Sequence, residues 1–433
     1  MFGIILALAL LMFLAYRGMS ILWIAPICAG IVALTGGIDL LTAYTENYMT
    51  GFVGFTKSWF PAFMLGAIFG KLMEVSGGAK SVAHFLVKLV STKRAVLAIL
   101  IGCIVLGYGG VSVFVIAFAM YPLALEVFRE ANITRKLIPG TLACGMFTIA
   151  MTSLPGTPQI QNLIPMQYFG TTPTAAPILG IVASIIMGLG GFLYLDRRAK
   201  YYTAKGEVFI EPAGKLSAET AMTSDYTDLP NPLLSFLPLI AVVIVLNILK
   251  QHVVVSLLSG ILTSIIISFN RLKGKYVKII NEGAQNSVLA IINTSAAVGF
   301  GAVVKAVPGF VTLTDIVLGI QGSPLLSCAI AVTLLAGATG SASGGMGIAL
   351  EALGAKYLAV AQATGISPAA FHRVASIASG GLDSLPHNGA IITVLSICGM
   401  THKDSYREMF VTTVLIPVIA TAVCIILGTI GIV

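Results

Sequence analysis

Long apolar runs separated by short polar stretches dominate this chain. A helix that spans a bilayer needs roughly 17–25 mainly apolar residues, so the runs predict transmembrane helices. The first run lacks a basic leader and a cleavage site, which favours a retained helix over a signal peptide. The runs are residues 2–16, 20–34, 175–194, 233–249, 253–269 and 409–432.

Composition agrees with that pattern. Only 10% of the 433 residues are charged, and the mean hydropathy is +0.97, whereas about a quarter of a soluble domain is charged. The six cysteines are scattered through apolar stretches, so neither a disulfide framework nor a metal site is expected, and no cofactor is indicated. The fold class predicted is an all-α polytopic membrane protein.

Basic residues give the orientation, because lysine and arginine concentrate in cytoplasmic loops. Membrane topology accounts for the net charge of +8, so no nucleic-acid partner is expected. With the clusters inside, residues 39–57 are predicted to lie outside along the interface, and 58–75 to cross back. The clusters are Arg17; Lys80, Lys88, Lys93 and Arg94; Arg129, Arg135 and Lys136; Arg197, Arg198, Lys200 and Lys205; Arg271, Lys273, Lys275 and Lys278; and Lys403 and Arg407.

Two basic clusters stand too close together for two full crossings. Between Arg94 and Arg129 lie 34 residues, and residues 95–106 would make a helix of only about 18 Å in a hydrocarbon core of roughly 30 Å. A re-entrant hairpin that turns at residues 107–110, "GYGG", resolves the conflict. In the second half the short run 324–336 predicts another hairpin, which turns in "GATGSASGGMG", residues 337–347.

Two further segments predict helices broken within the membrane. "TSLPGTPQIQN", residues 152–162, and "DSLPHNGA", residues 383–390, both contain proline and glycine. Proline removes a backbone donor and collides with the preceding helical turn. Each half of the chain therefore has three helices, a hairpin, a broken helix and a final helix, in opposite orientations.

Local matches support an inverted repeat. Gly109-Gly110 is matched with Gly344-Gly345, Ile133-Thr134 with Ile366-Ser367, and Ser153-Leu154-Pro155 with Ser384-Leu385-Pro386. The predicted organisation is a first repeat over residues 1–195, a cytoplasmic linker over 196–229 and a second repeat over 230–433. A transport core is expected at about 93–170 and 324–400, with the remaining helices as scaffold.

The four interrupted segments predict an anion site near the midplane. Non-helical backbone survives at membrane depth only where it packs in protein or lines a wet cavity, as in secondary transporters. Free N–H groups at helix starts bind carboxylates without a basic side chain. The candidate substrate-binding residues are Tyr108, Gly109, Gly110, Ser112, Ser153, Gly156, Thr157, Gln159, Asn162, Gly340, Ser341, Ser343, Gly344, Ser384, His387 and Asn388.

Plainer interpretations stay open for these segments. Glycine-rich turns also let helices pack closely, and membrane prolines are often simple kinks. Asp383, His387 and Glu351 are candidates for ion coupling, because ionisable groups inside a membrane are costly. Asp383 could instead cap the next half-helix, His387 could bond a backbone carbonyl, and Glu351 could be structural.

The sequence resembles the gluconate permease family of the ion transporter superfamily. The resemblance covers essentially the whole chain and is most specific in "GTPQIQNLIP", "GATGSASGG" and "SGGLDSLPHNGAIITVLSICGMTHKDSY". It implies a bacterial inner-membrane symporter that takes up organic acids together with protons. It also implies a scaffold and a mobile domain that moves as an elevator. A homodimer in the lipid bilayer is also implied.

Departures from that family point to a smaller substrate. "GYGGVSVFV" lacks the acidic residue expected near the first turn of sugar-acid members, and "SLPGTPQ" lacks their histidine. A hydroxy acid such as 3-hydroxybutyrate is therefore expected, with a gluconate-like acid and sodium coupling as alternatives. An anion channel, an intramembrane serine hydrolase built on Ser343 and a purely structural role are the rival functions.

Overall fold

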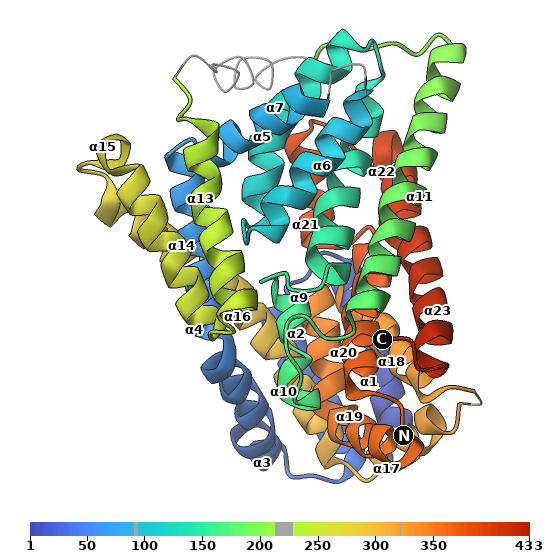
Figure 1. Cartoon of the computed structure of the whole chain (residues 1–433). Helices are drawn as coiled ribbons and strands as arrows, with labels where there is room; N and C mark the ends of the chain where they lie inside the picture. Colours follow the sequence, from blue (N-terminus) through green and yellow to red (C-terminus); the bar gives the residue numbers. More distant parts are fainter. Residues whose placement is uncertain (91–93, 213–227, 321) are drawn as a thin grey trace.

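The computed structural model describes residues 1–90, 94–212, 228–320 and 322–433, where every regular element is a helix (Figure 1). By length and composition, four continuous spans could cross a membrane: Leu40–Val75, Pro177–Ala204, Tyr276–Ala306 and His402–Thr429. On Pro177–Ala204 the apolar side chains of Ile181, Ile185 and Leu189 are exposed at helical spacing. Such a stripe suits contact with lipid. The all-α polytopic class is confirmed.

The first helices differ from the prediction at one point. α1 (Phe2–Tyr16) and α2 (Ile21–Gly36) are followed by one continuous helix made of α3 (Leu40–Thr42), η1 (Ala43–Tyr48) and α4 (Met49–Val75). Residues 39–57, predicted to lie outside along the interface, therefore belong to the same helix as the predicted crossing 58–75. The Asp39 carboxylate accepts a hydrogen bond from Thr42 N at 2.9 Å, which caps the helix and lets it begin early.

The rest of the first half contains the predicted hairpin and the predicted break. A mostly buried helix, α5 (Gly78–Val90), precedes the hairpin. The elements that follow are α6 (Ala95–Tyr108), α7 (Val113–Glu130), η3 (Arg135–Leu137), α8 (Ile138–Ala143), η4 (Cys144–Ser153), α9 (Ile160–Leu163), α10 (Met166–Phe169) and α11 (Pro177–Ala204). Because α11 continues to Ala204, it crosses the predicted boundary at residue 195. Part of the predicted linker, residues 213–227, lies outside the described residues.

The second half repeats this order. It opens with α13 (Pro232–Val243), η5 (Ile244–Ile248), α14 (Val253–Ile267), α15 (Phe269–Leu272), α16 (Tyr276–Ala306) and α17 (Gly309–Leu318). The hairpin, the broken helix and the last helix follow as α18 (Pro324–Thr339), α19 (Ala342–Thr364), α20 (Pro368–Ser379), η6 (Leu382–Ser384), α21 (Gly389–Ile397), α22 (His402–Phe410), η7 (Val411–Leu415) and α23 (Ile416–Thr429).

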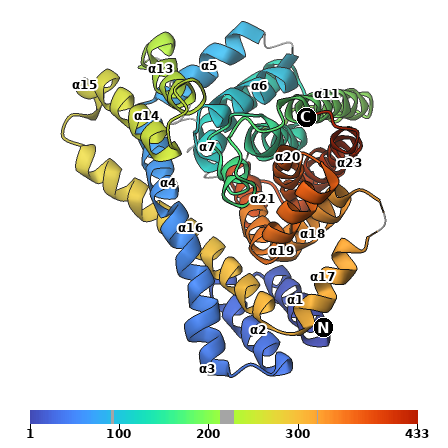
Figure 2. The same cartoon turned by 60° about the horizontal axis from the view of Figure 1, so that its bottom comes forward.

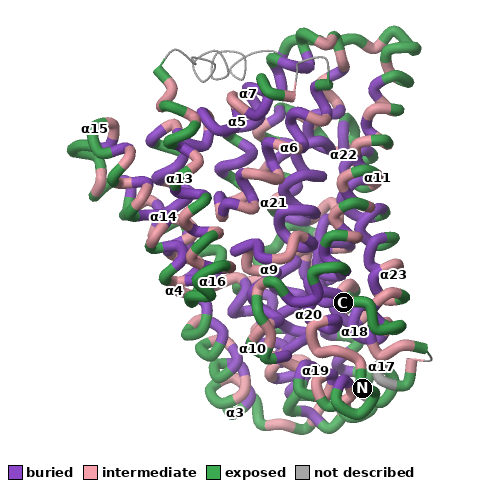
Figure 3. The backbone as a smooth tube through the Cα atoms, in the orientation of Figure 1, coloured by how far each residue is buried: buried purple, intermediate pink, exposed green. Residues whose placement is uncertain are grey.

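The two hairpins lie in opposite halves of the molecule. In Figure 1, α6 and α7 occupy the upper half, and α18 and α19 occupy the lower half. Figure 3 shows buried residues concentrated along the inner helices, including α6 and α20, and exposed residues along the outer ones, including α15. This arrangement agrees with two repeats of opposite orientation.

The long helices α4 and α16 pack side by side and cross the molecule (Figure 2). Their contact is partly polar: the Tyr48 hydroxyl donates to Ala296 O at 3.1 Å, and the hydroxyls of Thr56 and Ser295 lie 2.8 Å apart. With α1, α2, α13 and α14 they stand on one side of the interrupted elements. The hairpins and broken helices therefore face a wall of continuous helices.

Candidate functional site

The tip of the first hairpin is bound directly to the first helix break. Gly110 turns the chain with a φ of 90°, a conformation that glycine adopts without steric cost. The Gln159 amide nitrogen donates to Gly107 O at 2.8 Å and to Val111 O at 3.2 Å. The Tyr108 hydroxyl donates to Pro155 O at 3.2 Å. The break thereby satisfies carbonyls that the turn leaves without helical partners.

Several predicted ligands inside the first break hold its backbone instead of lining a cavity. Thr157 and Asn162 are fully buried; the Thr157 hydroxyl donates to Ala150 O at 2.9 Å, and the Asn162 amide donates to Thr157 O at 2.9 Å. The hydroxyls of Ser153 and Ser184 lie 2.8 Å apart. Gly156 N donates to Pro173 O at 2.8 Å. These groups compensate for the backbone bonds lost at the break.

The second hairpin turns at Gly340, where φ is 60°. Most of the glycine-rich run 337–347 is helical, so the predicted match of Gly344-Gly345 with the first turn was wrong. A Cβ on Gly345 would lie 2.1 Å from Ala336 N, so this glycine lets α18 and α19 approach closely. The Ser341 hydroxyl accepts from Gly344 N at 3.1 Å. Ser341 is thus the counterpart of Ser112, which caps the helix after the first turn.

The second break is capped by Asn388, whose side-chain oxygen accepts from Ala390 N at 2.6 Å and from Ile391 N at 3.0 Å. The alternative role of Asp383 as the cap is therefore wrong. The Asp383 carboxylate is buried and accepts from the Ser384 hydroxyl at 3.1 Å. His387 lies against the turn of the second hairpin, because a Cβ on Gly340 would come within 2.7 Å of its ring.

The four interrupted segments meet as a chain of contacts. Each tip touches the break of its own half, and the two breaks touch each other. Ser376 in α20 donates its hydroxyl hydrogen to Thr152 O at 2.7 Å, and Gly380 packs against the Thr152 side chain. The predicted convergence is therefore present, although the amide groups at the helix starts are largely occupied by the caps of their own segments.

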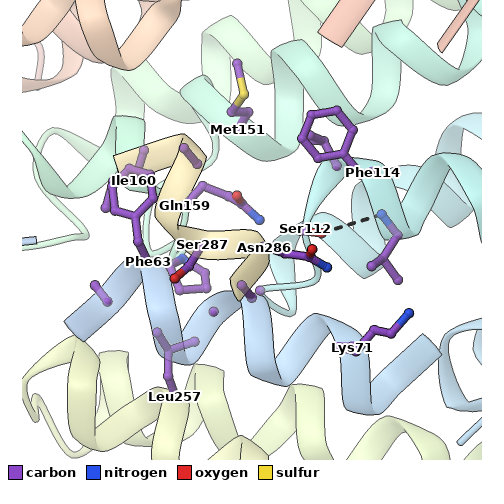
Figure 4. Close-up of a pocket in the computed structure, with 18 of the residues that line it drawn as sticks. Phe63, Lys71, Ser112, Phe114, Met151, Gln159, Ile160, Leu257, Asn286 and Ser287 are labelled. Carbon is purple, nitrogen blue, oxygen red and sulfur yellow. Dashed lines mark hydrogen bonds between the residues drawn. The ribbon is translucent and has the colours of Figure 1, made fainter. Parts of the chain in front are cut away.

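One cavity of about 690 Å³ lies between the first hairpin and the continuous helices. Ser112 and Gln159 line it from the interrupted side, while Asn286 and Ser287 line it from α16, and the four polar groups face the same space (Figure 4). Lys71 lines it from α4 and pairs with Glu74 at 2.9 Å and Glu282 at 3.4 Å. Glu74 and Gln161 also line it, so the cavity offers hydroxyl, amide, ammonium and carboxylate groups among apolar side chains.

The predicted residues divide between this cavity and other places. Gly110, Ser112 and Gln159 line the 690 Å³ cavity. Glu351 lines a separate cavity of about 390 Å³, where its carboxylate lies 3.2 Å from the Tyr168 hydroxyl and 3.6 Å from Lys305 Nζ. The candidates that line neither cavity are Tyr108, Gly109, Ser153, Gly156, Thr157, Asn162, Gly340, Ser341, Ser343, Gly344, Asp383, Ser384, His387 and Asn388.

Sequence reasoning missed a buried basic pair in α20. Arg373 is fully buried, and its guanidinium donates to Ala175 O at 2.8 Å and to Asn162 Oδ1 at 2.8 Å. His372 lies beside it, with ring nitrogens 2.6 Å from the Thr171 hydroxyl and 3.3 Å from Asn162 Oδ1. An arginine next to a histidine in an apolar helix was the available signal. The pair ties the second half to the first break.

Comparisons with known proteins place this architecture among transporters. An uncharacterized transporter of Bacillus subtilis, YxjC, is 43% identical over 451 aligned residues, which cover 95% of each chain. An uncharacterized permease of Haemophilus influenzae is 29% identical over 62% of this chain and 55% of its own length. No family model matches the sequence.

A solved structure shares the fold. The crystal structure of the YdaH transporter of Alcanivorax borkumensis, described as having an unusual topology, superposes with a TM-score of 0.61 at 14% sequence identity. The superposition covers 89% of this chain and 88% of YdaH. At that identity the likeness extends to the fold alone. The similarity along nearly the whole length of YxjC shows that this chain belongs to the family of membrane transporters that contains YxjC.

Proposed function

We propose that the protein is a secondary active transporter that takes up a small organic monocarboxylate together with a proton. The observation that carries the proposal is the cavity of about 690 Å³ between an interrupted hairpin and break on one side and the continuous helices α4 and α16 on the other. Secondary transporters bind their substrates where discontinuous helices meet near the midplane.

The polar groups of the cavity suit a hydroxy acid. The Ser112 oxygen already accepts from Val115 N, so the hydroxyl hydrogen is available to a carboxylate. The Gln159 amide nitrogen is occupied by two backbone carbonyls, which leaves its oxygen to accept from a substrate hydroxyl. Asn286 and Lys71 supply further donors from the opposite wall. A short 3-hydroxy acid such as 3-hydroxybutyrate combines both functions, and a gluconate-like acid is the larger alternative.

Asp383 is the proposed carrier of the coupling proton. Its carboxylate is buried in the second break, which contacts the first break through α20. A permanent charge is costly at membrane depth, and a carboxyl that takes up and releases a proton is charged during only part of a transport cycle. His387 and Glu351 are the other coupling candidates, since both lie at the second hairpin.

Alternating access would follow from movement of the interrupted elements against the continuous helices. The proposed moving body comprises residues of about 93–170 and 324–400, and α4 and α16 belong to the scaffold. The resemblance to the gluconate permease family supports this elevator movement, a homodimeric assembly and a place in the bacterial inner membrane. The cavity lies where the two bodies would separate, which supports the same division.

Uptake by purified protein in proteoliposomes tests the proposal. Labelled 3-hydroxybutyrate should accumulate under an inward proton gradient, saturate with concentration, exchange in counterflow and collapse with an uncoupler. Gluconate and acetate serve as comparison substrates. Absence of saturable uptake and of counterflow for all three acids would overturn the carboxylate assignment. Accumulation driven by sodium and indifferent to the proton gradient would overturn the coupling ion.

A further inference from the structure

A second cavity, of about 400 Å³, lies on the other side of the first helix break. Residues 158–161 of the break line the 690 Å³ cavity, whereas Leu163 and Met166 line the second one. On α4, Ala62 and Phe63 line the first cavity, and Trp59, one turn away, lines the second. The two cavities therefore share two walls, the break and α4, but no lining residue.

Two residues that line the second cavity each carry a buried polar atom with no hydrogen-bond partner within the described part of the chain. These atoms are Trp59 Nε1, a donor, and Asn247 Oδ1, an acceptor. Trp59 is only 8% exposed. The Asn247 amide nitrogen donates to Gly156 O at 2.9 Å and to Val243 O at 3.2 Å, which fixes the orientation of its oxygen. Buried polar groups are almost always hydrogen-bonded, so this pair points to a ligand with both an acceptor and a donor.

The rim of the second cavity is basic. Lys250 and His252 lie in the turn between η5 and α14 and line the cavity, and no aspartate or glutamate is found among its described lining residues. Lys250 has a φ of 51°, in the left-handed region that glycine adopts without strain. His252 Nδ1 accepts from Val254 N at 3.3 Å, so a neutral ring carries its hydrogen on Nε2 and donates outward.

The turn that bears these groups lies at the far end of a membrane helix from the polar linker. The helix Pro232–Ile248 starts beside the linker, which the basic residues predict to be cytoplasmic, and ends at the turn. The second cavity is therefore on the side of the first break that faces away from the linker. A solute from that side would meet Lys250 and His252 before it reached the break.

We propose that this second cavity is a binding site for a small hydroxylated organic anion, the vestibule from which the substrate approaches the transport site. The carboxylate would bind at Lys250, His252 and Trp59 Nε1, and the hydroxyl would donate to Asn247 Oδ1. The inference rests on the proposed function for the identity of the anion. The volume of about 400 Å³ accommodates a short hydroxy acid.

Tryptophan fluorescence tests the vestibule directly, because the chain contains only Trp23 and Trp59. The W23F protein has Trp59 as its sole tryptophan, and Trp23 is 48% exposed on α2, away from both cavities. Titration of detergent-purified W23F protein with 3-hydroxybutyrate should change the Trp59 emission saturably. The uncharged methyl ester of the acid should cause no saturable change, because it lacks the carboxylate.

Variants separate the vestibule from the transport cavity. K250Q in the W23F background should raise the dissociation constant for 3-hydroxybutyrate at least fivefold, whereas K273Q, an exposed lysine in the turn beyond α15, should leave it unchanged. N286L should weaken uptake and keep the Trp59 titration. In proteoliposomes, K250Q should raise the KM for uptake from the Lys250 side and leave kcat unchanged.

Specific results would overturn the vestibule. A W23F protein that transports a carboxylate without a saturable Trp59 signal would do so, as would a K250Q titration equal to that of W23F. A Trp59 signal produced by phosphatidylglycerol and by no carboxylate would identify a lipid site instead. A saturable Trp59 titration by 3-hydroxybutyrate in a protein that shows neither uptake nor counterflow would support the site and count against the proposed transport function alone.

Discussion

Replacement of Arg373 by methionine removes a buried polar tie between the two halves. The guanidinium is fully buried and makes five hydrogen bonds with four oxygen acceptors, all of them in or beside the first break. Methionine has a similar length and fills the same space without donors. The substitution therefore tests the hydrogen bonds and not the packing.

The expected cost follows from which acceptors lose their last donor. Pro173 O keeps Gly156 N at 2.8 Å, and Asn162 Oδ1 keeps His372 at 3.3 Å. Ser153 O and Ala175 O have no other donor among the described residues. Each carbonyl left unpaired costs about 1–3 kcal/mol. The loss of about 2–6 kcal/mol is partly offset because a buried charge no longer has to be desolvated, so we expect a net destabilisation of about 2–4 kcal/mol.

Thermal unfolding followed with a thiol-reactive dye measures this effect. The six cysteines are buried and free, so they react when the helices separate. With an unfolding entropy of about 2.1 cal/mol/K per residue, each kcal/mol moves the midpoint of a chain of 433 residues by about 1 °C. R373M should therefore lower the midpoint by about 2–4 °C, and R373K, which keeps one charge-assisted donor, should lie between R373M and the wild type.

The control is R197M, because Arg197 is also an arginine but is exposed to solvent. Exposed substitutions usually change stability by less than about 0.5 kcal/mol. An R373M midpoint equal to that of R197M would refute the reasoning, because it would show that Ser153 O and Ala175 O find other partners or do not need them.

Three further substitutions test separate features. G345A should lower the unfolding midpoint by about 1–3 °C, because the new Cβ would lie 2.1 Å from Ala336 N and overpacking costs about 1–3 kcal/mol; G389A, whose Cβ meets nothing within 4 Å, should unfold at the same midpoint as the wild type. D383N should abolish proton-driven accumulation in proteoliposomes and retain counterflow exchange; unchanged accumulation would remove this residue from the coupling path. N286L should raise the KM for uptake about 2–12-fold, since one hydrogen bond contributes about 0.5–1.5 kcal/mol; an unchanged KM would exclude contact with the substrate.

The interrupted elements were predictable because their cause is local. Glycine and proline end helices through the backbone itself, so "GYGG" and "SLPGTPQ" indicated a turn and a break without knowledge of any neighbour. The continuous helix Leu40–Val75 was missed because its first residues are polar. These residues follow the Asp39 cap at the solvent-exposed start of the helix. Their composition is therefore as polar as that of an interfacial segment, and the sequence does not distinguish the two.

The partners of these elements were not predictable in the same way. Asn286 and Ser287 lie on a long helix whose orientation is decided by its packing against α4. Arg373 acts on a break about 200 residues earlier in the chain, as its bond to Asn162 Oδ1 shows. Sequence reasoning found short polar side chains near the breaks but could not tell which of them cap helices and which line a cavity.

Two cavities lie along the α4–α16 pair, and only a short packed stretch of the two helices separates one cavity from the other. On α4, residues 62–74 contribute to the cavity of about 690 Å³ and residues 50–58 to the cavity of about 390 Å³ beside Glu351. Between these cavities α16 contacts the second hairpin partly through hydroxyls, with Thr294 Oγ1 3.3 Å from Ser343 Oγ, and partly through apolar contacts, with Val298 beside Gly347 and Ile348 beside Gly301. Since hydroxyl pairs exchange partners with little net loss, the polar contacts would not oppose movement of a body bearing the hairpins along this wall. The apolar contacts of Val298 and Ile348 would have to be replaced by others in each position, and alternating access requires such replacement at the surface between a scaffold and a moving domain.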